Sequence, residues 1–112
     1  MWLATKVGFF SVAISTVDGR AQFRARGAGD LDELRALLGQ EGVALSETLT
    51  IKADDYRHRA FIERKDLAAA FSILAETVDY ANFKSEIARH PSQCPKLNAY
   101  REVWAALHRI QD

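Results

Sequence analysis

The stretch SVAISTVDGRAQFRARG, residues 11–27, decides the fold, because two runs of strand-forming residues flank an Asp-Gly pair. The pair Asp18-Gly19 favours the type I′ turn of a β-hairpin, since both central positions of this turn require a positive φ. The strand before the turn is predicted over residues 2–15, and the returning strand over residues 20–26. The chain is therefore expected to begin with an antiparallel hairpin.

The register of this hairpin follows from its turn. With the Asp-Gly pair in the centre, Val12 lies opposite Ala25 and Ile14 opposite Phe23, while Gly8 in the long strand indicates a bulge or bend. Side chains alternate between the two faces of a strand. The predicted core face carries Phe10, Val12, Ile14, Phe23 and Ala25. The opposite face carries Phe9, Ser11, Ala13, Arg24 and Arg26.

A second hairpin is predicted from TLTIKADDYRHRAFIER, residues 48–64, with its turn at Asp54-Asp55. In that register Ile51 lies opposite His58. The apolar face then carries Leu49, Ile51, His58, Ala60 and Ile62. The other face carries Thr48, Thr50, Lys52, Arg57, Arg59 and Phe61.

Four helices are predicted from apolar residues at three- and four-residue spacing, over residues 30–39, 66–78, 79–90 and 95–110. Asp30 and Asp79 are expected to cap two of them, and His90-Pro91 ends the third. The stripe of the last helix is Leu97, Tyr100, Trp104, Leu107 and Ile110. The aromatic residues Tyr80, Phe83, Tyr100 and Trp104 are interpreted as core, the alternative being an aromatic surface that binds a partner.

The order ββαββααα predicts an α+β fold: a four-stranded antiparallel sheet from two β-hairpins, with helices packed on one face. The chain of 112 residues fits a single domain, residues 1–112. Its 15 basic and 15 acidic residues give a net charge of zero, so a basic site must be a local patch. One cysteine, Cys94, indicates a reducing compartment and a cytoplasmic protein. No stretch suggests membrane association.

The strongest candidate site is the second face of the sheet. Arg24 and Arg26 from the first hairpin share it with Lys52, Arg57 and Arg59 from the second. Ser11 and the aromatic rings of Phe9 and Phe61 lie on the same face. Cations interleaved with rings suit RNA or single-stranded DNA, because charge holds phosphates and rings stack on bases. The alternatives are a solvated face, and a face covered by a helix whose Glu86 or Glu102 pairs with the arginines.

Enzymatic and metal-binding interpretations rest on fewer residues. The cluster around His58 and Arg59, or Lys84, could serve a phosphate-handling enzyme such as a nuclease. However, His58 falls on the apolar face, and no P-loop, G-x-S-x-G or H-E-x-x-H motif is present. His90 and Cys94 lack the second pair of ligands that a zinc site needs. We therefore expect no metal or cofactor, and an inert thiol at Cys94.

Several stretches resemble a family of short uncharacterised bacterial proteins: MWLATKVGFFSV, FRARG, DYRHRAFI, DYANFKSEIA and YREVW, in this order. The likeness covers most of the chain, and the opening and the DYANFKS piece carry most of it. It implies a cytosolic bacterial or mobile-element protein that stands alone as one domain, and it brings no known activity. The positions that it marks are Trp2, Lys6, Phe9, Phe10, Ser11, Arg24, Arg26, Asp55, Tyr56, Arg59, Tyr80, Phe83, Lys84 and Ser85.

The sequence thus favours a small non-enzymatic module that binds an anionic partner, either nucleic acid or an acidic protein surface. The residues expected to bind are Phe9, Ser11, Arg24, Arg26, Lys52, Arg57, Arg59 and Phe61, with Lys6, Asp55, Tyr56 and Lys84 as secondary candidates. A protein-interaction module or homodimer, joined through the sheet face or an edge strand, is the second hypothesis. The phosphate-handling enzyme is the third.

Overall fold

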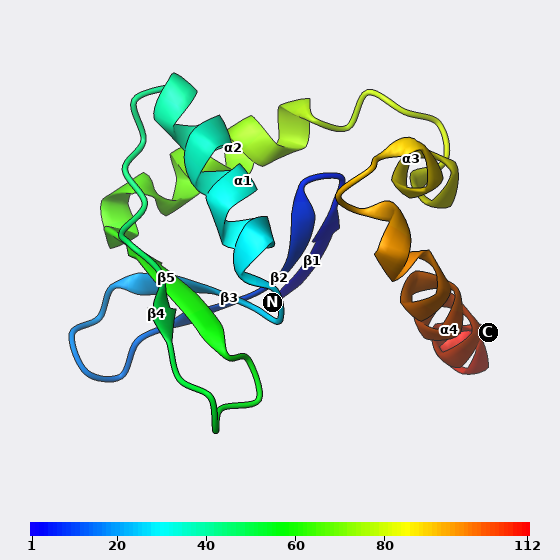
Figure 1. Cartoon of the computed structure of the whole chain (residues 1–112), viewed down its shortest axis with the longest axis horizontal. Coiled ribbons are helices and arrows are strands. Elements are labelled where there is room, and N and C mark those ends of the chain that lie inside the picture. The colour runs from blue at the N-terminus through cyan, green and yellow to red at the C-terminus, as the bar shows by residue number, and fades with distance from the viewer. The chain divides into compact units, whose positions relative to one another are not determined.

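A computed structural model describes all residues, 1–112, and shows an α+β fold with a five-stranded antiparallel sheet in the order β1-β2-β3-β5-β4 (Figure 1). The strands are β1 Trp2–Thr5, β2 Gly8–Ile14, β3 Ala21–Ala25, β4 Leu49–Thr50 and β5 His58–Ile62. The helices are α1 Ala28–Gln40, α2 Leu67–Glu76, α3 Phe83–Arg89 and α4 Leu97–Leu107. Short 3-10 turns cover Arg64–Asp66, Cys94–Lys96 and His108–Ile110. The predicted fold class is confirmed, with five strands in place of four.

Contacts divide the chain into two compact units, Met1–Val78 and Asp79–Asp112. The first unit contains the whole sheet with α1 and α2. The second contains α3 and α4. None of the helices combines the length and the hydropathy that a membrane-spanning helix requires.

The fifth strand arises because the predicted strand 2–15 folds back on itself. The Thr5 hydroxyl accepts hydrogen bonds from the amides of Val7 (3.3 Å) and Gly8 (3.1 Å), and donates one to the Gly8 carbonyl (2.8 Å). These bonds close a tight turn, so β1 pairs with β2 and Thr5 lies opposite Gly8. Gly8 was expected to mark a bulge or bend, and it marks this reversal.

The first hairpin has a register shifted by two residues from the prediction, with Val12 opposite Phe23. Ser15 and Arg20 close the loop, where the Ser15 amide donates to the Arg20 carbonyl at 2.8 Å. Of the two residues Asp18 and Gly19, only Gly19 has a positive φ (74°), so the predicted type I′ turn is wrong. A shift of two preserves the faces, because side chains alternate with a period of two. Ile14, at the strand end, is 40% exposed instead of buried.

The second hairpin is shifted by one residue, and this moves the side chains of β4, but not those of β5, to the other face. Thr50 lies opposite His58 and Leu49 opposite Arg59. The Ile51 amide donates to the Arg57 carbonyl at 2.8 Å, which closes a longer loop than the predicted two-residue turn. The placement of Leu49 and Ile51 on the core face is therefore wrong, and both side chains are exposed. Because this loop contains no glycine, no residue in it marks the number of residues that the turn spans.

The core of the first unit lies between the sheet and the helices α1 and α2. The Phe23 ring meets Phe10 and Phe71 edge-on, with centroids 5.8 and 6.3 Å apart. The predicted apolar faces supply most of the rest, and α1 adds its leucine stripe. The buried side chains include Val12, Ala25, Leu31, Leu34, Leu38, Ala60, Ile62, Ala70 and Leu74. The burial of one sheet face leaves the opposite face for the arginines.

Asp30 was expected to cap α1, but the helix begins one turn earlier, after Gly27. The side chain of Asp30 is buried instead, and its Oδ2 accepts the backbone amide of Phe9 at 3.1 Å. The helix start is thus tied to the beginning of β2. Satisfying a backbone amide in this way makes a buried carboxylate acceptable.

In the second unit, Asn82 caps α3 by accepting the Ser85 amide at 2.9 Å, so the predicted cap at Asp79 is wrong. The predicted end of this helix at His90-Pro91 is confirmed. Ile87 is fully buried, and the Phe83 ring packs edge-on against Tyr100 with centroids 5.0 Å apart.

The apolar stripe of α4 is not the core that the sequence predicts. No residue of α4 is buried, and Trp104 is 59% exposed. Leu107 and Ile110 are exposed as well. The reason is that a unit of two helices, of seven and eleven residues, offers too little surface to cover a stripe along its last helix.

Candidate anion-binding surface

Arginines from two neighbouring strands face each other on the side of the sheet opposite the core. Arg24 of β3 lies directly opposite Arg59 of β5, and Ser11 of β2 lies on the other side of Arg24. Like charges directly opposite each other in a sheet are destabilising unless nearby groups compensate them. The groups around these arginines therefore indicate how their positive charges are compensated.

Tyr56, from the loop between β4 and β5, covers Arg24 of β3 and Arg26, which follows this strand. The guanidinium carbon of Arg24 lies 5.3 Å from the ring centroid of Tyr56, and that of Arg26 lies 4.6 Å from it. Tyr56 is only 9% exposed. Arg24 also donates to the Ser11 hydroxyl at 2.7 Å, so Ser11, which is buried, serves to position Arg24.

The carboxylates that compensate the arginines come from the same loop. Arg59 forms an ion pair with Asp54, and its guanidinium lies 3.4 Å from the carbonyl oxygen of Tyr56. Arg26 donates to the Asp55 carboxylate at 3.1 Å and to the Asp55 carbonyl at 3.2 Å. We call residues 54–56 the acidic segment. Arg26 and Arg59 are thus paired by the loop of the second hairpin.

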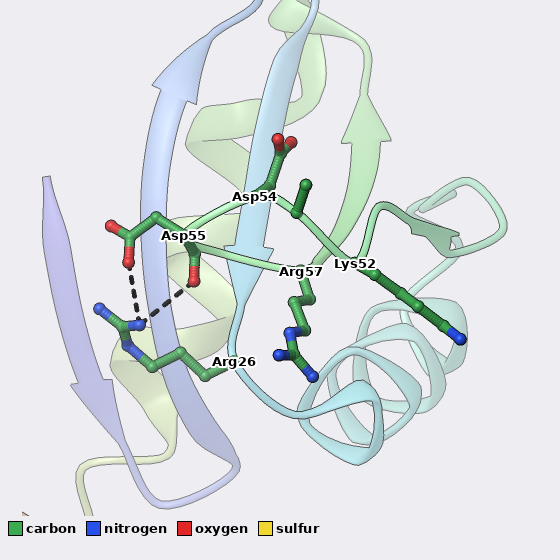
Figure 2. A pocket seen from close by; sticks show the side chains of 6 residues that line it. Arg26, Lys52, Asp54, Asp55 and Arg57 are labelled. Atoms are coloured by element: carbon green, nitrogen blue, oxygen red, sulfur yellow. Dashed lines mark hydrogen bonds and ion pairs between the residues drawn. The ribbon is translucent and has the colours of Figure 1, made fainter.

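A cavity of about 370 Å³ opens beside the acidic segment (Figure 2). It is lined by Arg26, Lys52, Ala53, Asp54, Asp55 and Arg57. Asp54 and Asp55 already pair with Arg59 and Arg26, whereas the exposed side chains of Lys52 and Arg57 form no ion pair or hydrogen bond. Figure 2 shows these two side chains extending away from the Asp54 carboxylate. The cavity therefore carries two positive charges that the chain does not neutralise.

The two phenylalanines predicted for this face are half-buried and have neighbours. The guanidinium of Arg20 lies 4.5 Å from the ring centroid of Phe61. Phe9 packs edge-on against Trp2 at 6.2 Å between centroids, and the Trp2 ring is 69% exposed. A base approaching this face would find Phe61 and Tyr56 already in contact with arginines, which weakens the case for stacking.

The residues of the enzymatic hypothesis occupy different environments. His58 is half-buried on the side of β5 that faces the core, and its Nδ1 lies 3.0 Å from the Thr50 hydroxyl. Arg59, the next residue, points to the opposite face. Lys84 belongs to the second unit, where its ammonium lies 4.5 Å from the ring centroid of Trp104. Lys6 lies in the turn between β1 and β2.

His90 and Cys94, the residues of the metal-binding interpretation, lie between α3 and α4 in the second unit. No group of three or more His, Cys, Asp or Glu side chains is placed to hold a metal ion. The exposed Cys94 directs its Sγ at the Pro91 carbonyl, 3.6 Å away.

Comparison of the chain with protein-family models, curated proteins and solved structures finds no match. The resemblance noted from the sequence therefore stays a prediction. Sequence reasoning missed Asp54 as a partner of Arg59 and Tyr56 as a cover for the arginines. The alternation of acid, ring and base in DDYRHR was the available signal, because a loop with both charges can pair with the strands that flank it.

Proposed function

We propose that the chain is a small non-enzymatic cytoplasmic module that binds an anionic partner. The binding surface is the cationic rim, which we define as Arg26, Lys52 and Arg57 around the cavity. The observation that supports this proposal most directly is that Lys52 and Arg57 have no anionic partner within the chain. Unpaired cations around one cavity raise the local concentration of anions, even on a neutral protein.

Arg24 and Arg59 lie opposite each other on the neighbouring strands β3 and β5. Arg24 is held by Ser11 and Tyr56, and Arg59 by Asp54, so their guanidiniums are committed within the chain. In the proposal Arg24 helps to position the loop, and the rim makes the first contacts with the partner. Arginine suits the rim because its planar fork binds carboxylate or phosphate through two parallel hydrogen bonds.

The test removes the unpaired cations without disturbing the fold. The variant Lys52→Ala/Arg57→Ala is compared with Arg64→Ala/Lys65→Ala, which removes two exposed cations that also lack ion-pair partners. Binding of single-stranded DNA of mixed sequence and of polyglutamate is measured at low salt by fluorescence anisotropy. We expect the first variant to bind at least one of these probes about tenfold more weakly, because each exposed charge contact contributes a fraction of the total free energy of binding.

The matched variant should bind like the unmodified protein, and binding should weaken as salt is added, since exposed charges are screened. Equal losses in both variants would show that only overall charge matters. The proposal would be wrong if the unmodified protein bound neither probe at low salt.

A protein-interaction module is a second candidate, supported by the exposed stripe on α4 and the turn after it. Val103, Trp104, Leu107 and Ile110 lie at helical spacing and are all exposed. Sedimentation at increasing concentration tests a homodimer formed through this stripe. A dimer that is lost in Leu107→Ser would support this candidate, and a monomer at the highest attainable concentration would remove it.

A further inference from the structure

We infer that the anionic partner is an acidic peptide stretch of another protein, whose carboxylates take the places now held by those of Asp54 and Asp55. This inference rests on the proposed function and adds the class of the partner. The acidic segment is then an internal ligand that occupies the arginines while the partner is absent. Three observations lead to this conclusion.

The first observation is the kind of group that the arginines hold. Arg26 binds both the carboxylate and the main-chain carbonyl of Asp55, at 3.1 and 3.2 Å. Arg59 binds the carboxylate of Asp54, and its guanidinium also lies near the carbonyl of Tyr56. Carboxylates alternating with main-chain carbonyls are the chemistry of an acidic peptide. The geometry of this face is therefore already matched to such a peptide.

The second observation is that the aromatic rings nearest the arginines are occupied. Tyr56 is almost fully buried against Arg24 and Arg26, and Phe61 lies beneath Arg20. Proteins that bind single-stranded nucleic acid generally stack bases on open rings. A peptide needs no such ring. This difference favours an acidic protein segment over RNA or single-stranded DNA.

The third observation is that Asp55 is held by an exposed ion pair and that the acidic segment leaves donors unsatisfied. Its hairpin is anchored by β4, which has only two residues. The pair of Arg26 and Asp55 is exposed on both sides, at 62% and 77%, and exposed pairs contribute little to stability. The buried Nε atoms of Arg24 and Arg59 lack a hydrogen-bond acceptor. A partner can therefore displace the segment, and it gains Lys52 and Arg57 in addition.

The test weakens the internal ligand and measures an external one. The variant Asp54→Asn/Asp55→Asn is compared with Glu41→Gln/Glu76→Gln, which changes the net charge equally at two exposed glutamates without ion-pair partners. The probes are a synthetic peptide containing Asp-Asp-Tyr, the same peptide with Asn-Asn-Tyr, and single-stranded DNA of mixed sequence. We expect the first variant to bind the acidic peptide about tenfold more tightly than the unmodified protein, because less competition remains.

The glutamate variant should bind the acidic peptide like the unmodified protein, and the Asn-Asn-Tyr peptide should bind to none of them. An equal increase in affinity for the acidic peptide in both variants would overturn the inference, because the change in overall charge would then explain the increase. Tighter binding of DNA than of the acidic peptide would overturn the partner class while the proposed function stands. Binding of neither probe would remove both.

A second measurement on the unmodified protein covers the case in which the aspartate variant does not fold. The acidic peptide is added to the labelled protein, and backbone amide resonances are followed by NMR. Residues 52–57 and Arg26 should shift together, while residues of α4 should not. Saturable binding that leaves the resonances of Asp54 and Asp55 unchanged would contradict displacement of the acidic segment.

Discussion

The substitution Gly8→Ala should destabilise the first unit, because no space exists for a single methyl group at this position. A Cβ built on Gly8 would lie 2.7 Å from Cβ and 2.8 Å from Cγ of Asp30, and 2.7 Å from Cζ of Phe10. Non-bonded contacts this short essentially never occur for a Cβ atom, so one neighbour must move. Phe10 is fully buried in the core, and Asp30 accepts the Phe9 amide. Either movement lowers the free energy of unfolding.

Displacing a core ring by one methyl group costs about 1–3 kcal/mol. Moving Asp30 away leaves the Phe9 amide without its acceptor, which costs about 1–3 kcal/mol if that amide stays buried. The two movements are alternatives, so we expect a loss of about 1–3 kcal/mol in the free energy of unfolding. At roughly 4 °C for each kcal/mol in a domain of this size, the melting temperature should fall by about 4–12 °C.

Thermal and urea unfolding, followed by circular dichroism, measure this loss. Gly29→Ala and Gly39→Ala are the controls, because both glycines lie in α1 and have no atom within 4 Å of an added Cβ. These variants should be as stable as the unmodified protein or more so, since alanine favours helix over glycine by up to about 1 kcal/mol. A Gly8→Ala protein that stays within about 0.5 kcal/mol of the unmodified one would refute the packing argument.

Three further predictions concern other parts of the chain. Phe23→Ala should cost about 3–5 kcal/mol in urea unfolding, because it removes the ring between Phe10 and Phe71, and a loss below about 1 kcal/mol would contradict its central place in the core. Asn82→Ala should reduce helicity and cost about 1 kcal/mol by removing the α3 cap, whereas Asn82→Asp should retain both. The Arg20 amide and guanidinium hold the pKa of Asp18 below its ordinary value, so this carboxylate favours the folded hairpin at neutral pH. That contribution is lost as the pH falls from the unfolded pKa through the folded one, and an NMR titration midpoint equal to that of the urea-unfolded chain would contradict it.

Whether the register error of a hairpin is an odd or an even number of residues explains which parts of the sheet the sequence could predict. In the first hairpin the error in register was two residues, so Val12 and Phe23 stayed on the core face as predicted. In the second hairpin the error was one residue, so Leu49 moved away from that face. Side-chain alternation therefore predicts faces well along a strand, while the length of a loop without glycine must be known before its two strands can be aligned.

The candidate site was predicted in part for the same reason. Arg24, Arg26 and Arg59 were assigned to one face from alternation within their own strands, and they lie there. The contacts of Asp54 and Tyr56 depend on how the loop folds over that face, which no local pattern specifies. The exposure of Trp104 could not be predicted either, because helical spacing indicates an apolar stripe but not which element covers it.

The shortness of β4 has a consequence for any measured affinity at this face. A strand of two residues contributes few ladder hydrogen bonds, so the hairpin opens at a lower free energy than the central strands. A partner that binds only the open form has an apparent dissociation constant equal to its intrinsic constant divided by the open fraction. With one open molecule in about a hundred, an intrinsically tight complex would look about a hundredfold weaker. Its association rate would then be limited by opening of the hairpin rather than by diffusion.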